Sequence, residues 1–173
     1  MEQTNKPKAV FPGSFDPYTV AHHELVKAAA KLFDVEILIC VNPYKDGGMF
    51  NSTERREIIE NVLRKEGIEN VTVSIWSGLV TQYCKQKEIE FIVRGIRYSN
   101  AAEELDLSHI YYEDEYVQTV FFPAYEVDHQ NVSSTRIREY INHGNQLWEW
   151  FVPYDAVETI NRFVARKRRE QIQ

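Results

Sequence analysis

Short apolar runs alternate along this chain with longer segments in which apolar residues recur at helical spacing. The short runs are rich in Val, Ile and Phe and are bounded by turn residues, a pattern that is typical of buried strands. The sequence therefore predicts five strands, at residues 8–11, 36–41, 71–75, 91–94 and 119–122.

Helical periodicity fills the segments between these runs. The first helix is expected to bury a stripe made of Leu25, Val26, Ala29, Leu32 and Phe33. Ser52 is a good N-cap for the second helix, and the helices that follow the first are expected at residues 53–65, 79–87, 101–112, 134–143 and 154–169. This alternation predicts an α/β fold, a Rossmann-like, doubly wound parallel sheet of five strands with helices on both faces. Ligands of such sheets bind beyond the carboxyl ends of the strands.

Composition narrows the class of protein. The 173 residues are 43% hydrophobic and 27% charged, which predicts one soluble domain over residues 1–173, with residues 1–7 as a loose tail. The net charge of −6 argues against general nucleic-acid binding, and no apolar run approaches the ~18 residues of a membrane span. The N-terminal segment lacks the apolar stretch of a signal peptide. Cys40, expected to be buried in a strand, and Cys84 form no disulfide framework, so we expect a cytoplasmic protein.

The turn after the first predicted strand, residues 12–22, carries the first candidate site. Gly13 allows a tight turn and a close approach of backbone to ligand, and Ser14 supplies a hydroxyl at the strand end. Thr19 is placed to cap the first helix, and His22 would lie in its first turn, where unpaired N–H groups favour phosphate. Alone, this turn fits an ordinary strand–turn–helix equally well. The neighbouring His23 is expected to be structural.

Two arginines follow the fourth predicted strand. Arg94 and Arg97 flank Gly95, which is expected to turn the chain sharply and to leave both guanidinium groups available for phosphate. Two surface arginines would give the same pattern. Lys45 lies in a glycine-rich loop after the second strand, where a lysine is ordinarily solvated.

A run of hydroxyl residues, Ser133, Ser134 and Thr135, opens the predicted helix at residues 134–143. Hydroxyl groups in this place cap a helix and can also bind phosphate. For such a run alone, plain capping is the simpler interpretation.

Together these segments resemble the nucleotidyltransferase superfamily. Residues 13–22, GSFDPYTVAH, are similar to the signature G-S/T-F-D-P-x-T/H-x-G-H, and residues 132–138, VSSTRIR, are similar to I-S-S-T-x-x-R. The run RGIR at residues 94–97, with Glu104 and Leu107 downstream, resembles the phosphopantetheine adenylyltransferase family in particular. Nicotinate mononucleotide adenylyltransferases share the two signatures but lack this run. The resemblance extends from residue 8 to about residue 163.

The resemblance implies adenylyl transfer from ATP to 4′-phosphopantetheine, which gives dephospho-coenzyme A and pyrophosphate in coenzyme A biosynthesis. It assigns catalysis to His22, Lys45 and Arg97. It also implies Mg²⁺, for which no protein carboxylate stands out as a ligand, and a homo-oligomer, by resemblance a hexamer.

Two sets of binding residues follow from the same resemblance. The acceptor would contact Ser14, Lys45, Val80 and Arg94. The nucleotide would contact Ser14, Phe15, His22, Gly95, Ile96, Arg97, Glu104, His129, Gln130, Asn131, Val132, Ser133, Ser134 and Thr135.

Three positions depart from the family pattern. Ala21 stands where the first signature has glycine, close to the expected α-phosphate. Gly78 replaces an acidic residue, and Tyr111 replaces an asparagine, both where the family holds the pantetheine arm. Two alternatives therefore stay open: the same chemistry on another phosphorylated acceptor, such as nicotinate mononucleotide, and a nucleotide-binding module that has lost catalysis.

Overall fold

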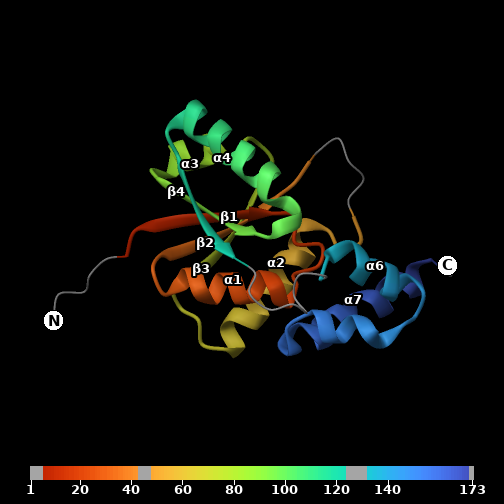
Figure 1. Ribbon diagram of the computed structural model, residues 1–173. Helices are drawn as coiled ribbons and strands as arrows, with labels where there is room; N and C mark the ends of the chain where they lie inside the picture. Colours follow the sequence, from red (N-terminus) through yellow and green to blue (C-terminus); the bar gives the residue numbers. More distant parts are fainter. Residues whose placement is uncertain (1–5, 43–47, 124–131, 172–173) are drawn as a thin grey trace.

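The computed structural model of the chain describes residues 6–42, 48–123 and 132–171 (Figure 1). Its centre is a five-stranded sheet in which all neighbouring strands are parallel, in the order β3-β2-β1-β4-β5. The predicted doubly wound sheet is therefore confirmed. The strands are β1 (Lys8–Gly13), β2 (Asp34–Cys40), β3 (Val71–Trp76), β4 (Phe91–Ile96) and β5 (Gln118–Pro123).

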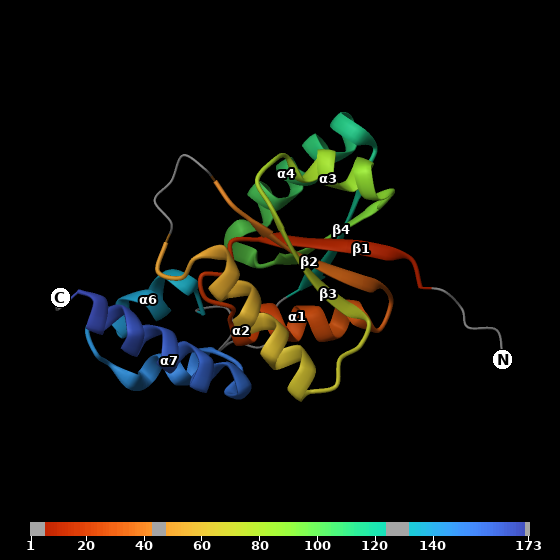
Figure 2. The ribbon, with the colours of Figure 1, turned by 180° about the vertical axis from the view of Figure 1, so that it is seen from behind.

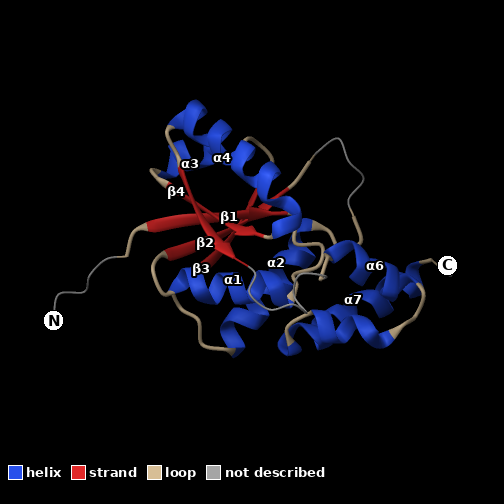
Figure 3. Cartoon of the chain, viewed as in Figure 1, coloured by secondary structure: helices blue, strands red, loops and turns tan. Residues whose placement is uncertain are grey.

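Helices cover both faces of this sheet (Figure 3). One face carries α1 (Val20–Ala30) and α2 (Ser52–Lys65), and the other carries α3 (Val80–Lys87) and α4 (Ala101–Glu115), which follows the short 3-10 helix η1 (Tyr98–Asn100). The view from behind shows α7 (Tyr154–Glu170) lying along α2, with α6 (Ser134–Asn142) beside it (Figure 2). The 3-10 helix η2 (Gln146–Phe151), which the sequence pattern did not predict, joins α6 to α7.

The alternation of side chains along β1 divides the core into two layers. Ala9 and Phe11 belong to the larger core, together with apolar residues of α1, α2, α6 and α7. Val10 points to the opposite face and belongs to a smaller core with Tyr83 and Cys84 of α3. Successive strand residues face opposite sides of a sheet, so this division follows directly from the strand geometry.

Some predicted details were wrong. Leu32 is 57% exposed because α1 ends at Ala30, so the helical period does not continue to this residue. The N-cap of α2 is Asn51 rather than Ser52, since the Asn51 side chain accepts a hydrogen bond from Glu54 N. Cys40 is half-buried rather than buried.

The predicted loose tail lies partly outside the described residues, which begin at Lys6. Lys6 Nζ donates to the carbonyl of Ala30 at 2.7 Å, and Asp34 N donates to the carbonyl of Pro7 at 3.0 Å. These two residues are thus attached to the body of the protein. Among the helices that the structure describes, none combines the length and the apolar character needed to cross a membrane.

Candidate active site

The start of α1 is closed by a reciprocal pair of hydrogen bonds. Thr19 is the N-cap, and its hydroxyl accepts from His22 N at 3.2 Å. In return His22 Nδ1 accepts from Thr19 N at 3.1 Å. Glutamate or glutamine usually takes this second part of a capping box. Because Nδ1 is the acceptor, the ring proton of neutral His22 lies on Nε2.

Three aromatic rings hold the His22 imidazole in place. Tyr18 stacks on it at 5.8 Å between centroids, and Phe15 meets it edge-on at 5.0 Å. Phe11 approaches at 6.1 Å. Phe15 also has a backbone φ of 50°, which is uncommon for a residue other than glycine. The ring orientation of His22 is therefore fixed by packing as well as by the cap.

The neighbouring His23 plays a structural part, as expected. It is buried, its Nδ1 lies 3.3 Å from the hydroxyl of Tyr18, and its Nε2 lies 2.9 Å from a carboxylate oxygen of Glu66. This chain of contacts holds Tyr18 against His22.

Burial, with smaller contributions from the charges of Arg97 and Arg94, lowers the pKa of His22 from 6.5 to about 4. At neutral pH His22 is therefore an uncharged hydrogen-bond donor. The folded state binds fewer protons than the unfolded state between these two values. The contribution of His22 to stability is therefore complete above pH 6.5 and is lost as the pH falls toward 4.

We expect His22 to show no titration between about pH 5.5 and pH 8 in the folded protein. The measurement is the ¹⁵N shift of the ring nitrogens of labelled histidine, with His22 assigned from the spectrum of His22→Gln. The Nε2–H tautomer of His22 should persist throughout this range. A midpoint for His22 near 6.5 would show that burial does not lower its pKa.

Arg94 is committed to an ion pair with Glu104. Its Nε and Nη2 each donate to one carboxylate oxygen of Glu104 at 2.7 Å, and Nη1 donates to the carbonyl of Pro12 at 3.3 Å. Burial opposes the charge of Arg94, but the hydrogen bonds and charge of Glu104 outweigh it and raise the pKa of the guanidinium. Arg94 therefore stays cationic, in a fixed orientation.

The expected sharp turn at Gly95 was wrong. Arg94, Gly95 and Ile96 belong to β4, which runs two residues further than predicted. A Cβ at position 95 would lie 3.0 Å from Leu25 Cδ1, so the glycine here allows α1 to pack closely on β4. The chain leaves the strand only at Arg97, whose backbone N–H donates to Asn100 Oδ1 at 2.7 Å.

The second signature meets the first across the end of the sheet. Ser133 caps α6, and its hydroxyl accepts from Arg136 N at 3.2 Å. Ser134 Oγ donates to the carbonyl of Pro17 at 2.8 Å, and Arg97 Nη2 donates to the carbonyl of Val132 at 3.3 Å. The start of α6 is thereby held against the turn before α1 and against Arg97, which follows β4.

These groups surround a cavity of about 570 Å³ at the carboxyl ends of β1 and β4. Strand order reverses between these two strands, since β2 follows on one side of β1 and β4 pairs on the other, and ligands of doubly wound sheets bind at such a point. Ala21 also lines the cavity. The predicted site residues that line it are Phe15, His22, Arg94, Gly95, Arg97, Glu104, Val132, Ser133 and Ser134.

Other predicted site residues lie elsewhere. Ser14, Ile96 and Thr135 do not line the cavity, and Val80 packs against the smaller core on the opposite face of the sheet. The remaining predicted contacts fall outside the described residues, at Lys45, His129, Gln130 and Asn131. Within residues 6–42, 48–123 and 132–171, no group of three or more His, Cys, Asp or Glu side chains could hold a metal ion.

Known proteins resemble this chain over most of its length. The cytidylyltransferase-like family model matches residues 10–140. A phosphopantetheine adenylyltransferase of Clostridium novyi is 34% identical over 163 residues, which cover 92% of this chain and 98% of that protein. Its counterpart in Thermotoga neapolitana is 35% identical over 166 residues, covering 92% and 99%.

Solved structures share the fold at low sequence identity. A nicotinic acid mononucleotide adenylyltransferase of Plasmodium falciparum, complexed with NaAD, gives a TM-score of 0.66 at 13% identity, covering 91% of this chain and 96% of that chain. A bifunctional NMN adenylyltransferase/ADP ribose pyrophosphatase of Francisella tularensis gives 0.60 at 18% identity, covering 94% and 54%. The solved structures show the fold alone, whereas the family model and the sequence relatives show the family. The chain belongs to the cytidylyltransferase-like family of nucleotidyltransferases, on its phosphopantetheine adenylyltransferase branch.

Proposed function

We propose that this enzyme transfers the adenylyl group of ATP to 4′-phosphopantetheine, giving dephospho-coenzyme A and pyrophosphate. The observation that carries the proposal is one cavity that gathers His22, Arg94, Arg97 and the N-termini of α1 and α6. Cationic side chains and helix N-termini together favour ligands with several phosphates. The names of the sequence relatives supply the identity of the acceptor.

The reaction needs no covalent enzyme intermediate. A phosphate oxygen of the acceptor attacks the α-phosphorus of ATP, the bond to the β-phosphate oxygen breaks, and pyrophosphate leaves. The protein therefore has to align the two substrates and stabilise the charge on the transferring group. In this proposal neutral His22 donates its Nε2 proton in a hydrogen bond to an oxygen of that group.

The arginines divide the two substrates between them. In this proposal Arg94, oriented by its ion pair with Glu104, binds the acceptor phosphate. Arg97, which donates to the carbonyl of Val132 just before α6, binds the nucleotide phosphates. Lys45 adds a third cation, which rests on the family resemblance alone.

Magnesium enters this proposal as part of the substrate. Glu104 is occupied by Arg94, and the described residues offer no cluster of carboxylates for a resident ion. Mg²⁺ usually keeps several waters and binds substrate phosphates, so we propose that it arrives bound to ATP. A cytoplasmic location and a homo-oligomer, a hexamer by family resemblance, belong to the same proposal.

The test is pyrophosphate release in the presence of ATP and Mg²⁺ with a panel of acceptors. We expect turnover with 4′-phosphopantetheine and none with nicotinate mononucleotide or with dephosphorylated pantetheine. Turnover with a different phosphate monoester would show that this compound is the acceptor, while adenylyl transfer would stand as the reaction. ATP binding without pyrophosphate release for any acceptor would indicate a module that has lost catalysis.

A further inference from the structure

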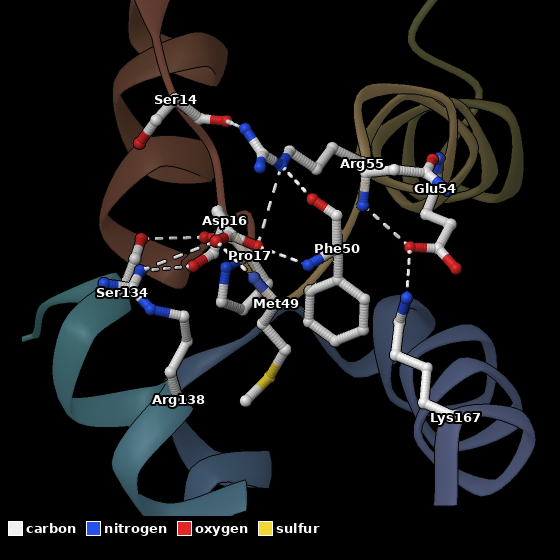
Figure 4. A network of polar contacts seen from close by, with 11 residues as sticks. Ser14, Asp16, Pro17, Met49, Phe50, Glu54, Arg55, Ser134, Arg138 and Lys167 are labelled. Atoms are coloured by element: carbon white, nitrogen blue, oxygen red, sulfur yellow. Dashed lines mark hydrogen bonds and ion pairs between the residues drawn. The ribbon is translucent and has the colours of Figure 1, made fainter. Parts of the chain in front are cut away.

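A buried carboxylate lies in the turn between β1 and α1 and is not part of the cavity lining. Asp16 is 5% exposed, and its two oxygens accept backbone hydrogen bonds from the segment before α2: Oδ2 from Met49 N at 3.0 Å and Oδ1 from Phe50 N at 2.9 Å (Figure 4). These residues are more than thirty positions apart in the chain. Asp16 therefore fastens the first signature to the entrance of α2.

Arg55 of α2 makes a second link between the same parts. It is 8% exposed, its Nε donates to the carbonyl of Phe50 at 2.5 Å, and its Nη1 donates to the carbonyl of Ser14 at 3.2 Å. Nε also lies 3.6 Å from Asp16 Oδ1. Gly48 passes directly over this pair, where a Cβ would collide with both side chains.

A third link reaches α6. Arg138 Nη1 donates to the carbonyl of Asp16 at 2.6 Å and lies 3.9 Å from Asp16 Oδ2, while Ser134 donates to the carbonyl of Pro17. Figure 4 shows the turn, the entrance of α2 and the start of α6 converging on Asp16. We call Asp16, Arg55 and Arg138 the Asp16 brace.

Stability alone is a weak reason for such a cluster. Buried ion pairs cost desolvation, and apolar replacements are often equally stable. What distinguishes this cluster is the position of the groups it holds. The turn it fixes carries Phe15, whose ring meets His22 edge-on at 5.0 Å, and the helix it fixes carries Ser134 in the cavity lining.

We propose that the Asp16 brace is a positioning device for phosphoryl chemistry in this cavity. It sets the distance between the first signature, with Phe15 and His22, and the second, with Ser134. Asp16, Arg55 and Arg138 act through the turn and the helix, without touching the substrates. The inference rests on the proposed adenylyl transfer for its kinetic readout only.

The test compares Arg55→Lys with a matched control, Glu54→Gln. Arg55→Lys keeps the charge but loses the fork that reaches Ser14 and Phe50 together. Glu54 is the adjacent α2 residue and is 4% exposed. Its carboxylate pairs with Arg166 and Lys167 of α7 and makes no contact with Asp16 among those described, and its bond from Asn51 N, at 2.8 Å in the α2 capping box, is one that glutamine can keep. Both changes should lower Tm. Only Arg55→Lys should lower kcat, about 10-fold or more, with KM for ATP changed less than kcat.

Arg138→Lys provides a second variant at a more tolerant position, since the Arg138 side chain is 30% exposed. It should show the same pattern as Arg55→Lys, and it decides the question if Arg55→Lys does not fold. A kcat within about twofold of wild type in the folded variant, or an equal loss in Glu54→Gln, would overturn the proposal.

A readout without substrate separates this proposal from the proposed function. The His22 Hε1 resonance reports the nearby Phe15 ring, so it should shift in Arg55→Lys and Arg138→Lys and stay in place in Glu54→Gln. If wild type does not turn over 4′-phosphopantetheine, the proposed acceptor fails while this shift still tests the brace. An unchanged His22 resonance in both brace variants overturns the brace whatever the enzyme's substrate is.

Discussion

His22→Ala is expected to lower kcat about 100-fold or more, equivalent to about 2.7 kcal/mol of lost transition-state stabilisation, with little change in ATP affinity. The reason is the fixed Nε2–H donor, which the capping box and three aromatic rings aim without any reorganisation. Such a donor acts on charge that develops during transfer, so its loss should fall on kcat. The measurement is steady-state kinetics together with calorimetric titration of ATP.

The control for this prediction uses the second role of His22. Alanine also removes the acceptor for Thr19 N, and loss of a cap costs about 1 kcal/mol of stability. Glutamine is a normal partner in a capping box, so His22→Gln should restore Tm while kcat remains low. Near-normal kcat in either variant would show that His22 does not stabilise the transition state. Recovery of kcat together with Tm in His22→Gln would show that the histidine serves only the helix.

The sequence allowed the sheet to be predicted, together with the edge of the sheet at which the cavity lies, because both follow from local patterns. Short apolar runs and helical stripes gave the parallel sheet, and the spacing of Thr19 and His22 gave the start of α1 correctly. His22 was likewise placed in the first turn of α1 by spacing alone. Its tautomer was not predictable, because that depends on which ring nitrogen meets Thr19 N.

Contacts between distant segments were beyond the reach of these patterns. The pairing of Arg94 with Glu104 was not predictable, because the two residues lie on different elements and each was expected to bind a substrate. Gly95 was expected to turn the chain, since its local pattern could not show that Leu25 packs over it. Arg55 gave no signal at all: a charged residue in an amphipathic helix is ordinarily solvated, and only the tertiary structure buries it against Asp16.

Arg97→Ala and Arg94→Ala are expected to weaken different substrates. A charge-assisted hydrogen bond contributes about 1.5–3 kcal/mol, so Arg97→Ala should raise the Kd of ATP about 10- to 150-fold. Arg94→Ala should raise the Kd of 4′-phosphopantetheine by at least a similar factor. Lysine at either position should restore only part of the affinity. At position 94 a point charge cannot reproduce the two bonds to Glu104 that orient the cation, and at position 97 it cannot reproduce the planar guanidinium. The measurement is calorimetric titration of each variant with each ligand separately.

The ion pair of Arg94 adds a control that separates lost attraction from new repulsion. Arg94→Ala leaves the buried carboxylate of Glu104 without this partner, in the lining of the cavity that is proposed to bind phosphate. The uncompensated carboxylate would then repel the phosphate. The double variant Arg94→Ala/Glu104→Gln removes both charges, so its acceptor affinity should lie between those of wild type and Arg94→Ala. Equal losses of both ligands in the two arginine variants would refute the division between them, though a shared phosphate site would survive. If wild type binds ATP but not 4′-phosphopantetheine, the departures at Gly78 and Tyr111 mark a different acceptor, and the cavity serves another phosphate monoester.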